Sequence, residues 1–250
     1  MFGFSLEVMA IIGVAICLGG FVKGLTGIGL PIVAIGILTN FLNPITTFAI
    51  LIIPILVTNL WQAIMAKDLA APLRRFPLMI AVFIIFLFIG VELAINLDRE
   101  LMLLVLGISV TVFSASTLIK PPAEPLSKAT ERWVGPAAGA VGGLLGGLTT
   151  IWGPPMLMLL VLLKLDKQTW IQTVGVIWFI GSIPLALAYW HNGILNTQTA
   201  SISALACVPG MIGIWLGEAV RKHINTDAFR KLLLATLFLI GVNLIRRGIF

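Results

Sequence analysis

The sequence predicts an all-α polytopic membrane protein with two inverted-topology repeats of about five segments each, and a broken or re-entrant helix pair in each repeat. Of its 250 residues, 59% are hydrophobic and 10% are charged, against about 25% charged in a soluble domain. Residues 24–66 and 169–217 contain no Asp, Glu, Lys or Arg, and roughly 20 helical residues cross a bilayer. Finally, the two halves of the chain resemble each other.

This composition excludes a soluble globular protein, a disordered chain and a nucleic-acid-binding protein. The formal net charge is +6, but the basic residues stand between long apolar runs, which is typical of a membrane protein. Cys17 and Cys207 lie in apolar segments without CxxC spacing, so we expect no metal site, no disulfide and no cofactor. The N-terminus lacks the features of a cleaved signal peptide, and we expect it to begin the first membrane segment.

Ten apolar segments follow one another, five on each side of a polar linker. In the first repeat, 1–119, we expect segments at roughly 6–22, 30–40, 45–65, 77–96 and 101–119. The linker, 120–132, resembles a solvated loop and is expected in the cytoplasm. In the second, inverted repeat, 133–250, we expect segments at roughly 133–149, 154–163, 169–190, 198–220 and 228–246.

An internal duplication relates the two halves. At a constant offset of 123 residues, six of twelve positions are identical between 20–31 and 143–154. Matches at Thr and Pro as well as at Gly argue against chance. The matching residues are Gly20, Gly24, Leu25, Thr26, Ile28 and Pro31 with Gly143, Gly147, Leu148, Thr149, Ile151 and Pro154.

Basic residues indicate the orientation in the membrane. Five segments per repeat would turn the second repeat upside down. If the loops near 66–77, 119–132, 164–168 and 221–231 are cytoplasmic, 13 of the 16 Lys and Arg residues lie inside, Lys23 included. Cytoplasmic loops of membrane proteins carry such an excess. We therefore expect both termini outside a cell membrane, as in a bacterial or archaeal inner membrane; Arg246 and Arg247 disagree with this pattern.

Two segments are too short to cross a bilayer. Residues 31–40 and 154–163 would each span about 15 Å as helices, and glycine-rich sequence precedes both. We expect Pro31 and Pro154 to open half-helices, whose free N–H groups and positive dipole ends attract anions. Interrupted segments at corresponding positions indicate a transporter's binding site. Two alternatives stay open: the glycines only permit close helix packing, and the short segments either cross fully or are re-entrant.

The predicted substrate site takes residues from the two breaks and from the third and eighth segments. A charge at Lys23 inside the membrane costs roughly 3 kcal/mol or more unless it is paired or hydrated. If the hairpin is re-entrant, Lys23 lies at that depth and is expected to attract anions. If the first segment crosses fully, Lys23 is instead an anchor at the cytoplasmic interface. The hydroxyls can equally bond to their own helices, and the amides can equally hold helices together. The site comprises Lys23, Thr26, Gly27, Gly29, Asn59, Gln62, Thr149, Thr150, Trp152, Gly153 and Trp178. A side chain added at Gly29 or Gly153 should block the anion, whereas Gly36→Ala should do little.

The doubled motif G-x-x-x-G-L-T with a following Pro resembles the TauE/SafE family of sulfite exporters. Residues 23–29 are similar to a common first-repeat form of that family, and the repeat plan extends the resemblance over nearly the whole chain. Residues 150–155, Thr-Ile-Trp-Gly-Pro-Pro, stand where many relatives are richer in glycine. The resemblance implies export of sulfur-containing anions such as sulfite or sulfonates.

The sequence thus predicts a secondary membrane transporter, an exporter, of small sulfur-containing anions, with alternating access at a midplane site between two half-helix ends. The alternative is a transporter or channel for another small solute: a carboxylate, an amino acid or a cation. His191 and His223 lie at segment ends and no Asp lies deep in a segment, so we expect no enzyme. The expected partners are membrane lipid and the anion, without nucleic acid; the coupling ion stays open, as does a homodimer.

Overall fold

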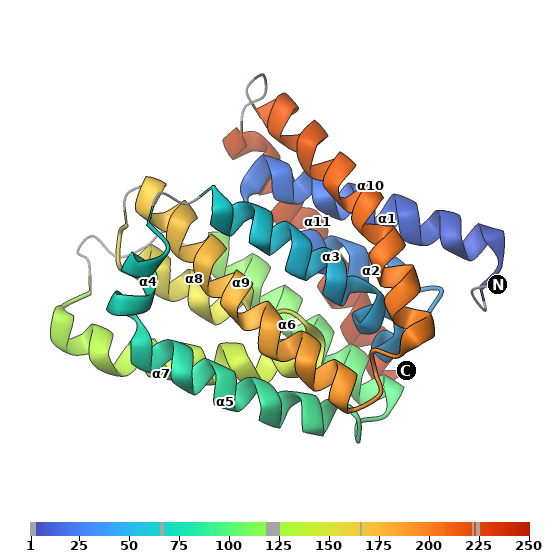
Figure 1. The fold of residues 1–250 in the computed structure, drawn as a ribbon, viewed down its shortest axis with the longest axis horizontal. Coiled ribbons are helices and arrows are strands. Elements are labelled where there is room, and N and C mark those ends of the chain that lie inside the picture. The colour runs from blue at the N-terminus through green and yellow to red at the C-terminus, as the bar shows by residue number, and fades with distance from the viewer. Residues whose placement is uncertain (1–3, 66–67, 119–125, 166, 222, 224–225) are drawn as a thin grey trace.

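The computed structural model describes residues 4–65, 68–118, 126–165, 167–221, 223 and 226–250. Over these residues the chain forms eleven α-helices and no strand (Figure 1). The first half contains α1 (Leu6–Thr26), α2 (Leu30–Leu38), α3 (Pro44–Ile64), α4 (Ala70–Arg75), α5 (Pro77–Ala94) and α6 (Arg99–Leu118). The second half contains α7 (Lys128–Thr149), α8 (Gly153–Leu162), α9 (Lys167–His191), α10 (Thr197–Arg221) and α11 (Thr226–Ile249).

Five of the described helices are long and apolar enough to cross a membrane: α1, α3, α5, α10 and residues Gln172–His191 of α9. Large apolar side chains also stand on the outside of the bundle, such as Leu78 at 60% exposure and Leu187 at 63%. Helices satisfy their backbone groups internally, so lipid can cover such a surface. The prediction of an all-α polytopic membrane protein is confirmed.

The helices differ from the expected segments at three places. α1 runs on to Thr26, so Lys23 lies in its last turn. α7 begins inside the expected linker at Lys128, because the Ser127 hydroxyl accepts from the Thr130 N–H as an N-cap; residues 119–125 of the linker lie outside the described residues. The short helix α4 was not expected at all, and the Asp68 carboxylate accepts from two N–H groups in its first turn.

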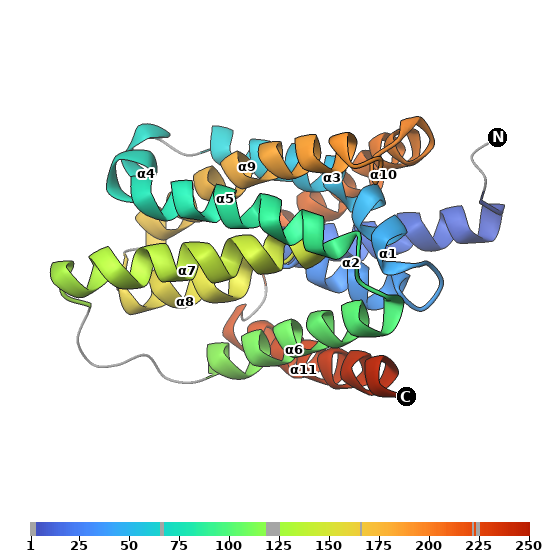
Figure 2. The same cartoon turned by 90° about the horizontal axis from the view of Figure 1, so that it is seen from below.

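The helices pack in pairs that join the two halves. α1 packs along α10, α5 along α7, α6 along α11 and α3 against α9 (Figure 2). Suppose that a two-fold axis matched α1 with α7, α3 with α9, α5 with α10 and α6 with α11. The α1–α10 pair would then be superposed on the α7–α5 pair, and the α6–α11 and α3–α9 pairs would each be superposed on themselves. This arrangement is what two related halves would produce, while the inverted repeat stays a prediction.

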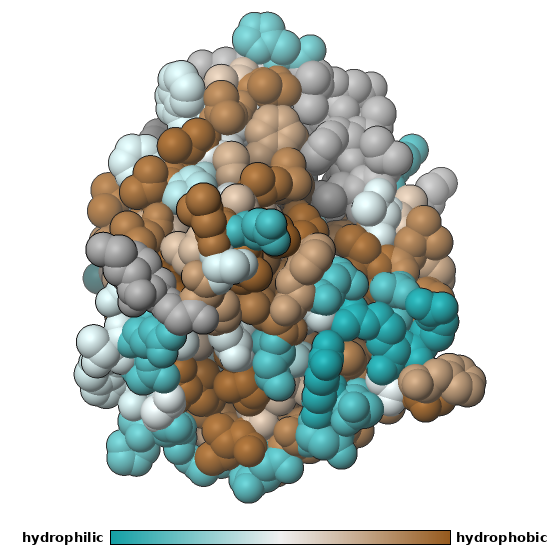
Figure 3. Space-filling model, turned by 90° about the vertical axis from the view of Figure 1, so that its right-hand side faces the viewer, coloured by the Kyte–Doolittle hydropathy of each residue, from teal (hydrophilic) through white to brown (hydrophobic). Residues whose placement is uncertain are grey.

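Both termini lie at one end of the bundle, and α4 lies at the other (Figure 1). Hydrophilic side chains are spread among apolar ones over the end with the termini (Figure 3). Arg247, one of the two arginines that disagree with the charge pattern, lies at this end of α11. Its guanidinium donates to the Asn40 Oδ1 at 2.9 Å and to the Thr39 carbonyl at 2.8 Å, at the C-terminus of α2. A cation suits the negative end of a helix dipole.

The repeated glycines allow the paired helices to approach closely. A Cβ on Gly24 of α1 would lie 3.0 Å from the Cα of Gly217 on α10, and a Cβ on Gly147 of α7 would lie 2.8 Å from the carbonyl carbon of Gly90 on α5. Real side chains do not tolerate such contacts with backbone. At these positions glycine is needed for close helix packing. Gly29 and Gly153 have no such backbone contacts, so their role lies in the breaks.

Candidate functional site

The first break separates α1 from α2 by three residues, two of which are glycines with a left-handed backbone. Gly27 has φ +83° and its N–H closes the end of α1 on the Lys23 carbonyl at 2.7 Å. Gly29 has φ +106° and is the N-cap of α2, with Pro31 in the first turn. Both angles lie in the left-handed region that glycine adopts readily. The break thus turns the chain sharply and leaves the N–H groups of Leu30 and Ile32 without helical partners.

The second break, between α7 and α8, is built differently. Thr150 takes the left-handed position, with φ +61°, where a β-branched residue is strained. α8 begins at Gly153 and has prolines at positions 154 and 155. Because proline has no N–H, the first turn of α8 offers fewer free donors than that of α2. The two half-helix ends are therefore unequal as anion sites, although the repeat motif suggested that they are alike.

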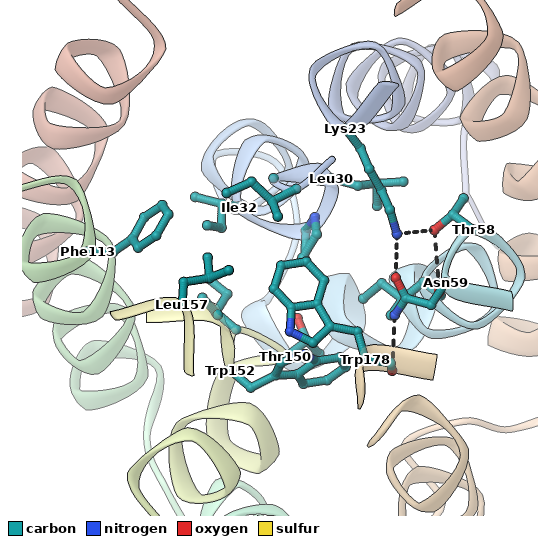
Figure 4. Close-up of a pocket in the computed structure, with 16 residues that line it drawn as sticks. Lys23, Leu30, Ile32, Thr58, Asn59, Phe113, Thr150, Trp152, Leu157 and Trp178 are labelled. Carbon is teal, nitrogen blue, oxygen red and sulfur yellow. Dashed lines mark hydrogen bonds between the residues drawn. The ribbon is translucent and has the colours of Figure 1, made fainter. Parts of the chain in front are cut away.

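A cavity of about 30 Å³ lies between the two breaks (Figure 4). A cavity needs roughly 10–15 Å³ to hold one water, so this one has the room of about two or three waters. Most of its wall is apolar, and its polar groups come from a few side chains. The lining residues are Lys23, Ile28, Gly29, Leu30, Pro31, Ile32, Ile55, Thr58, Asn59, Phe113, Thr150, Ile151, Trp152, Gly153, Leu157 and Trp178.

Lys23 reaches the cavity wall from α1 and is only 6% exposed. Its ammonium group donates to the Thr58 Oγ1 at 3.0 Å and to the Asn59 Oδ1. The Asn59 amide in turn donates to the Trp178 carbonyl at 3.3 Å, which links α1, α3 and α9 (Figure 4). Among the described residues, no carboxylate pairs with Lys23. An ammonium group in a low-dielectric site needs compensating charge, so this corner of the cavity favours an anion.

The opposite wall presents a hydroxyl with no partner. The Thr150 side chain is 1% exposed and its Oγ1 has no hydrogen bond in the structure. In Figure 4 it lies beside Trp152 and Trp178. The Trp152 ring packs against Phe83 in a T-shaped arrangement, with the ring centroids 6.0 Å apart. A buried polar group without a partner is costly, and an anion in the cavity would accept its hydrogen bond.

The structure brings seven of the eleven predicted site residues to the cavity wall: Lys23, Gly29, Asn59, Thr150, Trp152, Gly153 and Trp178. The other four do not line it. The Thr26 and Thr149 hydroxyls donate to the Val22 and Leu145 carbonyls of their own helices. Gly27 and Gln62 approach each other outside the cavity wall, where the Gln62 Oε1 is buried without a partner.

Sequence reasoning did not place Thr58, Phe113 and Leu157 in the site. Thr58 stands directly before Asn59 in an apolar segment, so its polar side chain could have indicated that it belongs to the site. Phe113 on α6 and Leu157 on α8 resemble every other apolar residue of their helices. Only the packing of those helices against the breaks brings them to the cavity.

The family model described as "Sulfite exporter TauE/SafE" matches residues 11–244, a range that contains both breaks. The chain belongs to the TauE/SafE family. Within the region matched to TauE/SafE lie all of the cavity-lining residues. This is a family of membrane transporters, which agrees with a chain that is not an enzyme.

The chain is also similar to "Probable membrane transporter protein YunE" of Bacillus subtilis (strain 168), with 28% identity over 166 residues. That match covers 58% of this chain and 59% of the relative. No solved structure matches the chain with statistical significance. TauE/SafE membership and the described helices together make the protein a multi-pass membrane protein.

Proposed function

We propose that this protein is a secondary transporter that binds a small sulfur-containing anion, such as sulfite or a small sulfonate, in the cavity between the two breaks. The observation that carries the proposal is the buried amino group of Lys23, whose hydrogen-bond partners among the described residues are all neutral. The unpartnered hydroxyl of Thr150 supports it from the other wall. The TauE/SafE family and its description as a sulfite exporter support the choice of anion.

The chemistry of the wall suits a transported anion. Lys23 supplies the counter-charge, Thr150 supplies a neutral donor, and the free N–H groups of Leu30 and Ile32 lie at the positive end of α2. The described lining contains no arginine, so no bidentate guanidinium clamp holds the ion there. Such a site binds weakly enough to release its cargo, and its small volume favours the smallest candidate, sulfite.

The cavity lies where the two halves of the chain meet, which supports alternating access. Each half contributes one break, and α3 and α9 pack against each other beside them. Rocking one half against the other would open the same site first to one face of the membrane and then to the other. We propose export, with the anion entering from the cytoplasmic side.

Thermal unfolding of the purified protein tests the proposal, with sulfite, sulfate, sulfoacetate, taurine and carboxylates as ligands. A ligand at 100 times its Kd should stabilise the protein by about 2.7 kcal/mol, and we expect sulfite or a sulfonate to give the largest shift. Proteoliposomes then separate a transporter from a channel, because only a transporter shows saturable flux that is accelerated by anion on the far side. Stabilisation by cations or amino acids alone would refute the proposal.

A further inference from the structure

α3 contains a proline one turn before the residues that bind Lys23. Pro54 lies inside the helix, four positions before Thr58 and five before Asn59. Proline has no N–H, so the carbonyl of Ile50 loses the donor that an uninterrupted helix would provide. A buried carbonyl without a donor is costly in a membrane protein, and the helix is free to bend at this point.

A hydroxyl from another helix fills the gap. Ser203 of α10 is fully buried, and its Oγ donates to the Ile50 carbonyl at 2.8 Å. The same Oγ accepts from the N–H of Ile53 at 3.1 Å. One side chain, 150 residues away in sequence, therefore inserts into the hydrogen-bond ladder of α3.

The helix that carries Ser203 also packs tightly against α1. A Cβ on Gly213 would lie 2.8 Å from the backbone nitrogen of Phe21, and one on Gly217 would lie 3.0 Å from the Cα of Gly24, directly after Lys23. α10 thus contacts backbone on both sides of the site: that of α1 beside Lys23, and that of α3 beside the proline. It is placed to set the distance between the lysine and its two partners.

We propose that Ser203 is a positioning residue of the anion site. By supplying the hydrogen bond that Pro54 cannot donate to the Ile50 carbonyl, it holds the following turn of α3 where Thr58 and Asn59 meet Lys23. This inference rests on the proposed function, because its first test measures anion binding. It assigns a role in the site to a residue that does not line the cavity.

The test measures the Kd of sulfite for purified variants that unfold cooperatively. Ser203→Ala should weaken sulfite binding by about five- to tenfold, because the turn of α3 that follows Pro54 is no longer held. Ser201→Ala is the control, since the Ser201 hydroxyl donates to the Thr197 carbonyl within α10 at 2.8 Å; its Kd should equal that of the wild type. Pro54→Ala restores an N–H for Ile50, so the double variant Pro54→Ala/Ser203→Ala should recover at least half of the lost affinity.

An unchanged Kd in folded Ser203→Ala would overturn the inference and leave Ser203 with a purely stabilising role. A double variant no tighter than Ser203→Ala would overturn it as well. If the wild type binds none of the anions, the proposed function fails, and hydrogen exchange decides the positioning role alone. Exchange of the amides of residues 53 and 55–59 should then be about tenfold faster in Ser203→Ala and slow again in the double variant, as expected when a local opening loses its hydrogen bonds. Unchanged exchange would refute the positioning role.

Discussion

The Nζ of Lys23 lies 3.0 Å from the Oγ1 of Thr58, and both side chains are buried. The two residues are 35 positions apart and come from helices on either side of the first break. A hydroxyl and an amide oxygen accept hydrogen bonds from the amino group, but neither carries a charge that could pair with an ammonium. An anion in the cavity would supply the missing counter-charge to a protonated Lys23.

Lys23→Met should weaken sulfite binding by about 10- to 100-fold, the worth of a hydrogen bond to a charged group. Methionine keeps the apolar stem and removes the charge. Lys128→Met is a matched control, because Lys128 is exposed in the first turn of α7. Isothermal titration of folded variants measures both. Equal affinities in the two variants would remove Lys23 from the site.

Thr150→Val should lower sulfite affinity about two- to tenfold, the range of a neutral hydrogen bond. Thr150→Ser keeps the hydroxyl and should bind like the wild type. The control is Thr111→Val, which removes another buried hydroxyl without a partner, on α6 and outside the cavity wall. If Thr111→Val weakens binding as much as Thr150→Val, the effect does not come from the cavity.

Gly153→Ala should fold normally and bind sulfite at least about tenfold more weakly, a loss of about 1.4 kcal/mol. Its Cβ would meet Leu157 at 3.4 Å and Trp178 at 3.5 Å, which are ordinary contacts, but it would take space from the cavity. Gly13→Ala is the control, since no atom lies within 4 Å of its Cβ. Gly36→Ala, expected from the sequence to do little, is a poorer choice because its Cβ would lie 2.9 Å from Ile240. A normal Kd in Gly153→Ala would place the anion elsewhere.

Cysteines at positions 127 and 196 should react with a membrane-impermeant thiol reagent from opposite sides of the membrane. α7 begins at the end of the bundle with α4, and α10 begins at the end with the termini (Figure 2). Ser127→Cys should be protected in intact cells and Asn196→Cys should be labelled, in a background with Cys17 and Cys207 replaced by alanine. Labelling of both from the same side would refute the inverted topology.

Much of the fold was predictable because its signals are local. Long uncharged stretches reveal the membrane helices, and Gly-rich sequence before Pro31 and Pro154 reveals the two breaks. The short helix α4 and the early start of α7 were missed, because each depends on a single side chain that accepts a hydrogen bond from the first turn, Asp68 and Ser127.

By itself, the sequence determined the membrane class, the two breaks and the set of polar residues near them. Only the tertiary structure decided which of these meet. Thr149 and Thr150 are neighbours, yet one hydroxyl bonds within α7 and the other is buried without a partner in a residue of the cavity wall. Asn59 and Gln62 were both expected in the site, yet only Asn59 reaches Lys23. Hydropathy and helix-breaking chemistry act through neighbours in the chain, whereas these contacts depend on how α1, α3, α9 and α10 pack, and that packing is set by residues far apart in the sequence.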